Sequence, residues 1–429
     1  MLKRGQAIKV LCFFKVNAKV KNTSKGEKMQ DSQRREFIKD SAKVVGGLAA
    51  LTLGADTLFA AQNEANSAKI VFKEGERIPA KGYAAFSKDW KFKPYSFTRH
   101  PLGENDVLIA IRYAGICHSD LHTVKGDHGK ANYPMVPGHE IAGEVVAVGK
   151  KVSKFKVGDY AGVGCMVNSC GECEACKQSK EQYCTNAKTV FTYNSKDVFH
   201  NDEITYGGYS NNIVVSEKFA IKVPKNAEFE KVAPLLCAGI TTYSPIRFSK
   251  VKKGDKVAVA GVGGLGHMAL QYMVALGAEV TCFDIVPSKK EACLKFGAKA
   301  FVDVKSEEFK KIANRFDFII STIPYKYNIN DYVRMLKFGG EMAIVGLPAA
   351  KDFPNFDVNA FVWQFRDKKI YASLIGGIKE TQEMLDYSVK NKIYPKVEII
   401  PIQKLDEAYQ KVAKGEADFR FVIDMKSLS

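Results

Sequence analysis

Short apolar runs alternate with a helical pattern between residues 228 and 371. Lys256–Ala260 has the composition of a short buried strand, and an apolar helix is predicted over residues 267–276. A second strand follows at residues 279–283 and is closed by Asp284. Because strands that alternate with helices form βαβ units, this stretch predicts a parallel sheet with helices on its faces.

Four further apolar runs extend the predicted sheet. They lie at residues 300–302, 316–320, 341–345 and 370–374. With the two strands above they make six, the strand number of the doubly wound dinucleotide-binding fold. The pattern therefore predicts an α/β domain of this type.

A glycine-rich turn joins the first predicted strand to the first helix. It contains Gly261, Gly263, Gly264, Leu265 and Gly266. The first glycine permits a tight turn, the second lets the backbone approach a pyrophosphate, and the last lets the helix pack close to the strand. The helix N-terminus offers free N–H groups to the phosphates. Because a strand precedes the turn, a helix follows it and an acidic residue lies 23 positions beyond Gly261, the pattern predicts a bound dinucleotide.

Asp284 and the lysines after it favour different cofactors. A carboxylate at the end of the second strand can hydrogen-bond the adenosine ribose and repel a 2′-phosphate, which favours NAD. Lys289 and Lys290 lie close by in the sequence and can instead attract the phosphate of NADP. The residues favour NAD and leave NADP as the alternative.

Composition and charge exclude some classes of protein. The 429 residues suffice for two domains, and 46% hydrophobic with 26% charged residues is ordinary for a soluble globular protein. No apolar run reaches the roughly 18 residues that predict a membrane span. The net charge of +17 divides into +7 on residues 1–61 and +10 on the remainder, without the dense basic stripe that nucleic-acid binding needs.

Residues 1–68 predict a targeting signal and not a folded domain. Arg34 and Arg35, followed by a modest apolar stretch and a cluster of alanines, resemble a twin-arginine export signal. Residues 1–28 carry eight Lys or Arg against one acidic residue, which suits neither a signal nor a domain, so we expect translation to start at Met29. Export predicts a periplasmic location. Because a free nicotinamide pool is not expected in the periplasm, a cytoplasmic location is the alternative.

Four cysteines fall within fifteen residues, at Cys170, Cys173, Cys176 and Cys184. Four thiolates at such spacing can close a tetrahedron around Zn²⁺ and leave no open position, as a structural zinc site does. An iron–sulfur cluster of the bacterial ferredoxin type would place its fourth cysteine three residues on, whereas the gap here is seven. Disulfides are the other alternative in an exported protein.

A second set of metal ligands is dispersed along the chain. Cys117, His139 and Cys237 lie in three separate segments that are rich in glycine and polar residues. Two cysteines and one histidine leave the fourth position of a zinc ion open, as a catalytic site requires. Such an ion can polarise a carbonyl or hold an alkoxide. The assignment of these three residues to one catalytic zinc ion follows from the family resemblance described next.

These motifs together resemble the zinc-containing medium-chain alcohol dehydrogenases, from roughly residue 70 to the C-terminus. Segments 375–385 and 420–424 are similar to the cinnamyl-alcohol-dehydrogenase-like branch. The resemblance implies a partly antiparallel, GroES-like β catalytic domain at residues 69–227 and 372–429. A doubly wound parallel (Rossmann) domain at residues 228–371 would interrupt it, with the active-site cleft between the two.

The resemblance also implies roles for single residues. Glu140, directly after the ligand His139, is expected to approach the metal in the resting enzyme. Asp120 corresponds to a carboxylate that orients the ligand histidine. Ser119 matches the hydroxyl that hydrogen-bonds the substrate oxygen, and His122 matches the surface end of a proton relay. Thr241 matches a contact to the nicotinamide side of the cofactor.

The implied activity is hydride transfer between a primary alcohol or aldehyde and a nicotinamide cofactor, with two zinc ions per chain. The family forms dimers and tetramers, so a homo-oligomer is expected, with a small-molecule substrate and no nucleic acid. The cinnamyl branch usually has a small hydroxyl residue where Asp284 stands, and it uses NADP. Asp284 therefore puts that cofactor preference in question.

Two other functions compete with this interpretation. A zinc-ribbon protein that binds nucleic acid needs basic or aromatic residues interleaved with its zinc lobe, and residues 170–184 hold few: Lys177, Lys180 and Tyr183. A related reductase of quinones or enones is the nearer alternative. Such reductases usually lack the catalytic zinc ligands, which this chain keeps.

Overall fold

The computed structural model describes residues 58–60, 70–349, 352 and 367–428. All of these belong to one compact unit, Thr57–Ser429. The predicted export signal, the proposed start at Met29 and residues 1–57 in general lie outside the described part of the chain. Among the described residues, no helix combines the length and the apolar character needed to cross a bilayer.

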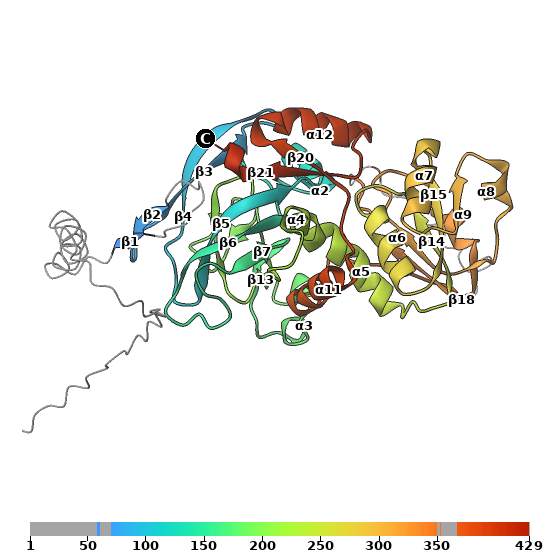
Figure 1. Cartoon of the computed structure of the whole chain (residues 1–429), viewed down its shortest axis with the longest axis horizontal. Coiled ribbons are helices and arrows are strands. Elements are labelled where there is room, and N and C mark those ends of the chain that lie inside the picture. Colours follow the sequence, from blue (N-terminus) through green and yellow to red (C-terminus); the bar gives the residue numbers. More distant parts are fainter. Residues whose placement is uncertain (1–57, 61–69, 350–351, 353–366, 429) are drawn as a thin grey trace, which may run out of the picture. The chain divides into compact units, whose positions relative to one another are not determined.

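The predicted six-stranded parallel sheet is confirmed (Figure 1). Its strands lie in the order β16-β15-β14-β17-β18-β19, and every pair is parallel. In order along the chain this is 3-2-1-4-5-6, the order of the dinucleotide-binding fold. The bounds are β14 Lys256–Ala260, β15 Glu279–Asp284, β16 Ala300–Asp303, β17 Phe316–Ser321, β18 Leu336–Ile344 and β19 Lys369–Ala372.

Both faces of this sheet are covered, which explains why its strands are almost wholly apolar. Along β14, Val257 and Val259 pack into one core cluster, whereas Ala258 and Ala260 pack into another on the opposite face. Helix α6 lies on the first face. Helices α8 and α9 contribute to the second. The helices are α6 Gly266–Ala275, α7 Lys290–Lys295, α8 Glu307–Lys311 and α9 Ile329–Val333.

The second domain, which the resemblance predicts to be the catalytic domain and which is called so below, is built on a mostly antiparallel seven-stranded sheet. Its order is β13-β7-β6-β5-β21-β20, with β12 paired to β5, and β20 with β21 is its one parallel pair within the described residues. The strands are β5 Asp106–Gly115, β6 Ile141–Val148, β7 Tyr160–Val163, β12 Asn212–Ser216, β13 Ile221–Lys222, β20 Val397–Pro401 and β21 Arg420–Asp424. Because β20 and β21 follow the dinucleotide domain in the sequence, the chain returns to complete the sheet that it began.

Smaller elements surround this sheet. Four antiparallel pairs are formed by β1 Leu58–Ala60 with β2 Val71–Lys73, β3 Ile78–Ala85 with β4 Phe92–Arg99, β8 Met166–Asn168 with β9 Val190–Phe191, and β10 Lys196–Asp197 with β11 Glu203–Ile204. The helices are α2 His118–Lys125, α3 Glu174–Lys177, α4 Val232–Pro234, α5 Ile240–Phe248, α11 Ile378–Asn391 and α12 Leu405–Lys414.

One helical segment belongs to both domains. Helices α4 and α5 are joined by a π-helical turn, η3 Leu235–Gly239, and all five residues of that turn are buried. The core cluster around them runs without a break from Ala142 and Ile221 of the catalytic sheet to the first face of the dinucleotide sheet. This shared core fixes the segment that carries Cys237.

The glycine turn before α6 yields a prediction about stability. A Cβ atom at Gly266 would lie 2.0 Å from the carbonyl oxygen of Gly261. Because this oxygen belongs to the backbone, the clash could be removed only by moving the main chain of the turn. Gly266→Ala should therefore cost about 1–3 kcal/mol of folding free energy and lower the thermal midpoint by several degrees. Gly263→Ala is the matched control, because a Cβ there meets no described atom within 4 Å. Equal midpoints for the two variants would contradict this account of Gly266.

Candidate active site and metal centres

The structure brings Cys117, His139 and Cys237 together. Cys117 caps the N-terminus of α2, His139 lies just before β6, and Cys237 lies in the turn η3. Cys237 Sγ lies 3.8 Å from Cys117 Sγ and 3.2 Å from His139 Nε2. With Glu140 they form a group in which one donor atom of each residue lies within 4.8 Å of the others, and all four are buried.

A buried carboxylate orients two of these ligands. Asp120 is fully buried, and its Oδ1 lies 2.9 Å from His139 Nδ1, which directs the other ring nitrogen toward the cysteines. Its Oδ2 accepts hydrogen bonds from the backbone N–H of Cys117 at 2.9 Å and from the hydroxyl of Tyr209 at 2.9 Å. A carboxylate that holds a ligand imidazole fixes its tautomer and raises its basicity.

The donor set fits zinc. The Cys237 thiol and the His139 imidazole lower the pKa of the Cys117 thiol well below its usual value, although burial acts the other way. Thiolate sulfur and imidazole nitrogen are ligands that zinc prefers, at about 2.0–2.3 Å. The observed separations between donors suit one ion at such distances. In addition, Glu140 Oε2 is buried and has no hydrogen-bond partner among the described residues, so it is available to a metal.

Glu140 is held by an arginine from the far end of the chain. Arg420, at the start of β21, donates from Nη2 to Glu140 Oε1, and both side chains are buried. Burial raises the pKa of the Glu140 carboxyl to about 7, although Arg420 acts the other way. A Cβ at Gly264 of the dinucleotide turn would lie 2.9 Å from Arg420 Nη1. Arg420 thus lies between the metal site and the glycine turn.

Sequence reasoning missed four residues of this site. Arg420 lies in the segment 420–424 that carries the family resemblance, but the sequence pattern predicts no role for it at the metal, and Tyr209 lies in no predicted motif. Tyr193 stacks on His139 with ring centroids 5.9 Å apart and planes 15° apart, and the thiols of Cys117 and Cys165 raise the pKa of the Cys237 thiol. The sequence carries no spacing signal for them, because each reaches the site from a different segment.

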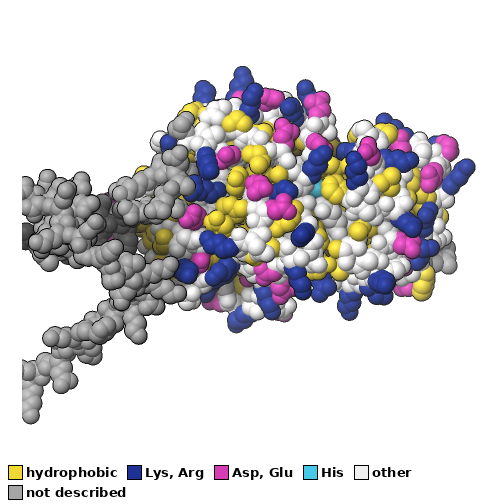
Figure 2. All heavy atoms as spheres, viewed as in Figure 1, with side chains coloured by type: hydrophobic (Ala, Val, Ile, Leu, Met, Phe, Trp, Pro, Cys, Tyr) yellow, Lys and Arg dark blue, Asp and Glu magenta, His cyan; other side chains and the backbone are white. Residues whose placement is uncertain are grey.

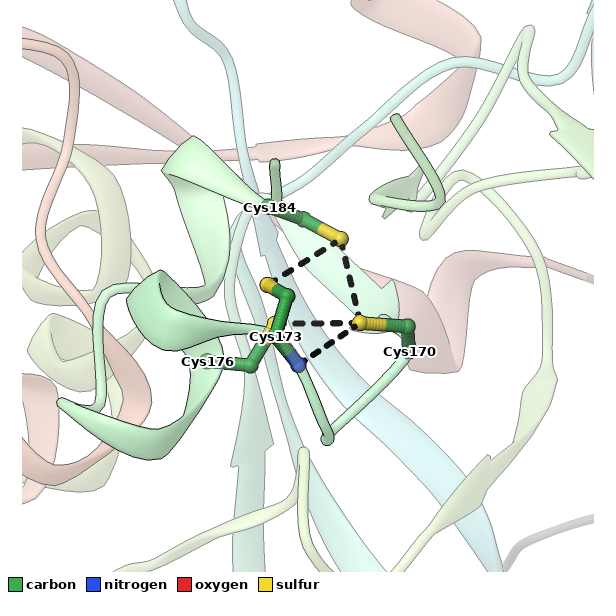
Figure 3. Close-up of side chains that lie close together, drawn as sticks. All are labelled: Cys170, Cys173, Cys176 and Cys184. Carbon is green, nitrogen blue, oxygen red and sulfur yellow. Dashed lines mark hydrogen bonds between the residues drawn. The ribbon is translucent and has the colours of Figure 1, made fainter. Parts of the chain in front are cut away.

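The four-cysteine cluster closes as predicted (Figure 3). Cys184 Sγ lies 3.4 Å from Cys170 Sγ, and the pairs Cys170–Cys176 and Cys173–Cys184 are separated by 3.8 and 3.9 Å. A tetrahedron with Zn–S bonds of about 2.3 Å has sulfurs roughly 3.8 Å apart. The nine cysteines that the structure describes are all free, so the disulfide alternative is wrong for them. The cluster is a structural zinc site.

This zinc lobe supports the segment by which the chain leaves the dinucleotide domain. The hydroxyl of Tyr183 accepts a hydrogen bond from the N–H of Leu374 at 3.0 Å, and Glu181 Oε2 accepts one from the N–H of Ile378 at 3.0 Å. A Cβ at Gly377 would lie 1.7 Å from the carbonyl oxygen of Ser179. The lobe therefore fixes the return segment at the start of α11.

The glycine turn fits a pyrophosphate. Gly261 has φ +84°, a conformation that favours glycine, and Gly264 and Gly266 would clash if they carried a Cβ. Gly263 faces open space among the described residues, which leaves room for a ligand to approach the backbone. Leu265 precedes α6, whose N-terminus begins at Gly266. Three of the four glycines are therefore closely packed against the protein, and the backbone at Gly263 is accessible to a ligand.

Asp284 is engaged within the protein. Its Oδ2 accepts hydrogen bonds from the N–H of Val262 at 2.6 Å and from Lys289 Nζ at 3.1 Å, and its Oδ1 accepts one from the N–H of Val286 at 2.9 Å. The side chain is only 5% exposed. Its charge is therefore balanced locally, and its hydrogen-bonding capacity is largely used in holding the glycine turn.

The remaining predicted residues lie on the helices next to the metal site. Ser119 and His122 are on α2, and Thr241 is buried in the first turn of α5. His122 Nδ1 lies 2.8 Å from Asp127 Oδ2, and its buried Nε2 has no partner among the described residues. The side chain of His122 is 14% exposed and that of Asp127 is 29% exposed, so the pair lies near the surface.

Two family models match the chain. The model described as alcohol dehydrogenase GroES-like domain matches residues 103–225, and the model described as zinc-binding dehydrogenase matches residues 264–390. Together they cover most of the sheet of the catalytic domain and most of the dinucleotide domain.

Individual proteins resemble the chain over most of its length. NADP-dependent alcohol dehydrogenase C 1 from Mycolicibacterium smegmatis is 45% identical over 81% of this chain and 98% of its own. Probable formaldehyde dehydrogenase AdhA from Bacillus subtilis is 46% identical over 79% and 95%. The crystal structure of CAD from Helicobacter pylori in complex with NADP(H) is 54% identical, covers 82% and 99%, and superposes with a TM-score of 0.79.

The Asp120 contacts predict how tightly the catalytic site holds its metal. Asp120→Asn should weaken zinc binding there by about 10–100-fold, because the amide cannot balance the charge at His139. Tyr209→Phe, which removes one donor to Asp120 and leaves the carboxylate in place, should have a smaller effect. The measurement is the zinc retained per chain during dialysis against a graded series of chelator concentrations. If Asp120→Asn retained as much zinc as the wild type, this role of Asp120 in metal binding would be excluded.

Proposed function

The chain belongs to the zinc-containing medium-chain alcohol dehydrogenases, and from that premise we propose that it works as an NADP-dependent reductase of aldehydes through the site of Cys117, His139 and Cys237. Its reaction class is that of a zinc-dependent alcohol dehydrogenase or aldehyde reductase with a nicotinamide cofactor. The observation that carries the proposal is the convergence of the three ligands beside the dinucleotide turn. The proposal goes beyond this reaction class in three respects: the choice of cofactor, the direction of the reaction and the roles of single residues.

The residues around the metal divide the chemistry between them. Zinc bound here supplies a Lewis acid that polarises the oxygen of an aldehyde or alcohol. Asp120 keeps the His139 ring aimed at the metal position. Glu140, hydrogen-bonded to Arg420, stands beside the three ligands and would be a further ligand for the ion when no substrate is bound. The buried walls of the site exclude water from the reacting atoms.

We assign the proton path to α2 and the loop after it. In aldehyde reduction, Ser119 Oγ delivers a proton to the substrate oxygen, and His122 restores it from solvent. The position of the His122 ring supports this assignment, because one nitrogen faces the protein interior and the other meets Asp127. Alcohol oxidation uses the same groups in reverse.

The environment of Asp284 supports NADP as the cofactor. The carboxylate that favoured NAD in the sequence is turned inward onto the N–H of Val262, and Lys289 balances its charge. Lys289 is a quarter exposed and stands beside it, so it can also meet a 2′-phosphate. Among the relatives, the Mycolicibacterium enzyme is named for NADP and the Helicobacter structure holds NADP(H). We propose NADP on these grounds, with NAD as the weaker cofactor.

The competing functions fit less well. A quinone or enone reductase does not need the three catalytic zinc ligands that converge here. A protein that binds nucleic acid needs its basic residues gathered in a patch or stripe. On the face drawn in Figure 2, Lys and Arg are interspersed with Asp and Glu and form no continuous stripe.

Two further elements are proposals from the sequence and the family. We propose a homo-oligomer, for which the outer strand β19 of the dinucleotide sheet offers an edge. We also propose export to the periplasm through Arg34 and Arg35, with a cytoplasmic enzyme as the alternative outcome. Fractionation of cells that produce the native precursor, with and without Arg34→Lys plus Arg35→Lys, distinguishes the two locations.

Loss of a zinc ligand should abolish turnover without abolishing cofactor binding. His139→Ala should lower kcat/KM for aldehyde reduction by on the order of 10³-fold or more, because the polarising metal is lost. Binding of NADPH, followed by its fluorescence, should remain, because the dinucleotide turn lies in the other domain. Cys293→Ser, at a buried cysteine of α7 outside both zinc clusters, is the control and should keep its activity. Hydride transfer in a variant shown to lack the catalytic zinc would overturn the proposed function.

The cofactor proposal makes its own prediction. Lys289→Ala should raise the KM for NADPH by about 10-fold or more, since hydrogen bonds to charged groups contribute roughly 1.5–3 kcal/mol, and should change the KM for NADH little. Lys295→Ala is the matched control, because Lys295 is an exposed lysine at the end of α7, the helix that Lys289 precedes as N-cap, and it pairs with Glu291. Steady-state assays with both cofactors and a panel of aliphatic and aromatic aldehydes give the values. Wild-type preference for NADH would refute the NADP assignment.

A further inference from the structure

A pair of histidines that belongs to neither cysteine site is stacked on the catalytic domain. His100 directly follows β4, and His200 lies in the turn between β10 and β11. Their rings are almost parallel, with centroids 3.8 Å apart and planes 9° apart. Asp106, at the start of β5, completes the cluster: one donor atom from each of the three residues lies within 4.8 Å of the others.

The hydrogen bonds of both rings leave a nitrogen lone pair available. His100 Nδ1 lies 2.9 Å from the carbonyl oxygen of Pro101, and His200 Nδ1 lies 2.7 Å from Asp197 Oδ2. Both partners are acceptors, so a neutral ring carries its proton on Nδ1 and its lone pair on Nε2. His100 Nδ1 also lies 4.0 Å from Asp106 Oδ2, so the ring must turn before Nε2 and Asp106 share an ion. Histidines that bind metals typically donate one N–H to a carbonyl or carboxylate in this way.

The charges around the pair suit a divalent cation. Asp106 and Asp197 bring two carboxylates with little exposed side-chain surface, 13% and 9%. Burial, and then the neighbouring His200, lower the pKa of His100, whereas the hydrogen bond to Asp197 raises the pKa of His200. The two carboxylates carry the charge that balances one M²⁺ ion, and binding of the ion displaces any proton that His200 holds at Nε2. Without an ion, two acidic groups surround two rings that cannot both be protonated without repulsion.

The cluster also borders a cavity. The space is about 70 Å³, and its lining includes His100, Asp106, Asp197, His200 and Glu203. The buried guanidinium of Arg99 also lines it and donates to the carbonyl oxygens of Gly207 and Asn212. Glu203 is occupied by Arg77, which donates two hydrogen bonds to it at 2.8 and 2.7 Å. Since one water needs roughly 10–15 Å³ of such space, the cavity admits an ion with several waters.

We propose that His100, His200 and Asp106 form a third metal site in this chain, for a divalent transition-metal ion with nitrogen and oxygen ligands, and that Asp197 is the residue that orients His200. Zn²⁺ fits the donors, because imidazole and carboxylate are among its usual ligands, and waters fill the remaining positions. Binding turns the two stacked rings toward a common point. The ion then joins the β4–β5 junction to the β10–β11 hairpin, segments about a hundred residues apart.

The site is tested by metal content of the whole enzyme. Untagged protein with its two cysteine sites filled is dialysed against buffered Zn²⁺ and analysed by mass spectrometry of the metal. We expect three zinc ions per wild-type chain and two in His200→Gln and in Asp106→Asn. Asp202→Asn, an exposed acid next to the cluster but outside it, is the matched control and should keep three. A wild-type count of two, or a third ion that survives both substitutions, overturns the proposal.

Cobalt distinguishes this site from the cysteine sites. Co²⁺ added to the zinc-loaded enzyme should give weak visible d–d bands without the near-ultraviolet thiolate-to-cobalt charge-transfer band, and His200→Gln should lose them. Thiolate bands would show that Co²⁺ enters a cysteine site instead, and would overturn the assignment. Circular dichroism of each variant verifies its fold. Asp106→Asn preserves the shape of its side chain, so it tests the site even if the change at His200 disturbs the turn.

Discussion

The catalytic site depends on one buried carboxylate. Asp120 has no access to solvent, and an uncompensated charge in such a place costs several kcal/mol. It is compensated by His139 from the segment before β6, by the backbone of Cys117 at the start of α2, and by Tyr209 from the segment before β12. The need to satisfy this one side chain therefore aligns two of the three zinc ligands before any metal is bound.

The two domains are coupled through residues that serve both. Arg420 holds Glu140 beside the metal and packs against Gly264 of the dinucleotide turn. The four-cysteine lobe supports the return segment through Tyr183 and Glu181. The chain leaves the catalytic sheet once and returns once, and each crossing is fixed by buried or metal-linked contacts. The relative position of metal and cofactor is thus set by few side chains.

Much of the fold could be predicted from local patterns, because the parallel strands are buried on both faces and the glycine turn has a fixed spacing. The cysteine lobe was predictable for the same reason. Partners that are distant in the sequence could not be predicted. Arg420 and Glu140 are 280 residues apart, and isolated histidines such as His100 and His200 have no spacing signal. Asp284 shows another limit. The prediction that Asp284 ends the second strand is confirmed. The direction in which its carboxylate points depends on the N–H of Val262 and on Lys289, and neither contact can be read from the sequence.

The widened turn η3 has a consequence for how the sequence can change. A π-helical turn contains one residue more than an α-helical turn, and such turns are frequent at functional sites. Here the extra residue shifts the helical phase between α4 and α5, so that Cys237 lies beside His139 while Leu236 and Ile240 stay in the core. Removal of one residue would restore a regular helix and rotate everything after it by about 100°. Insertions and deletions are therefore excluded from this segment even where single substitutions are tolerated.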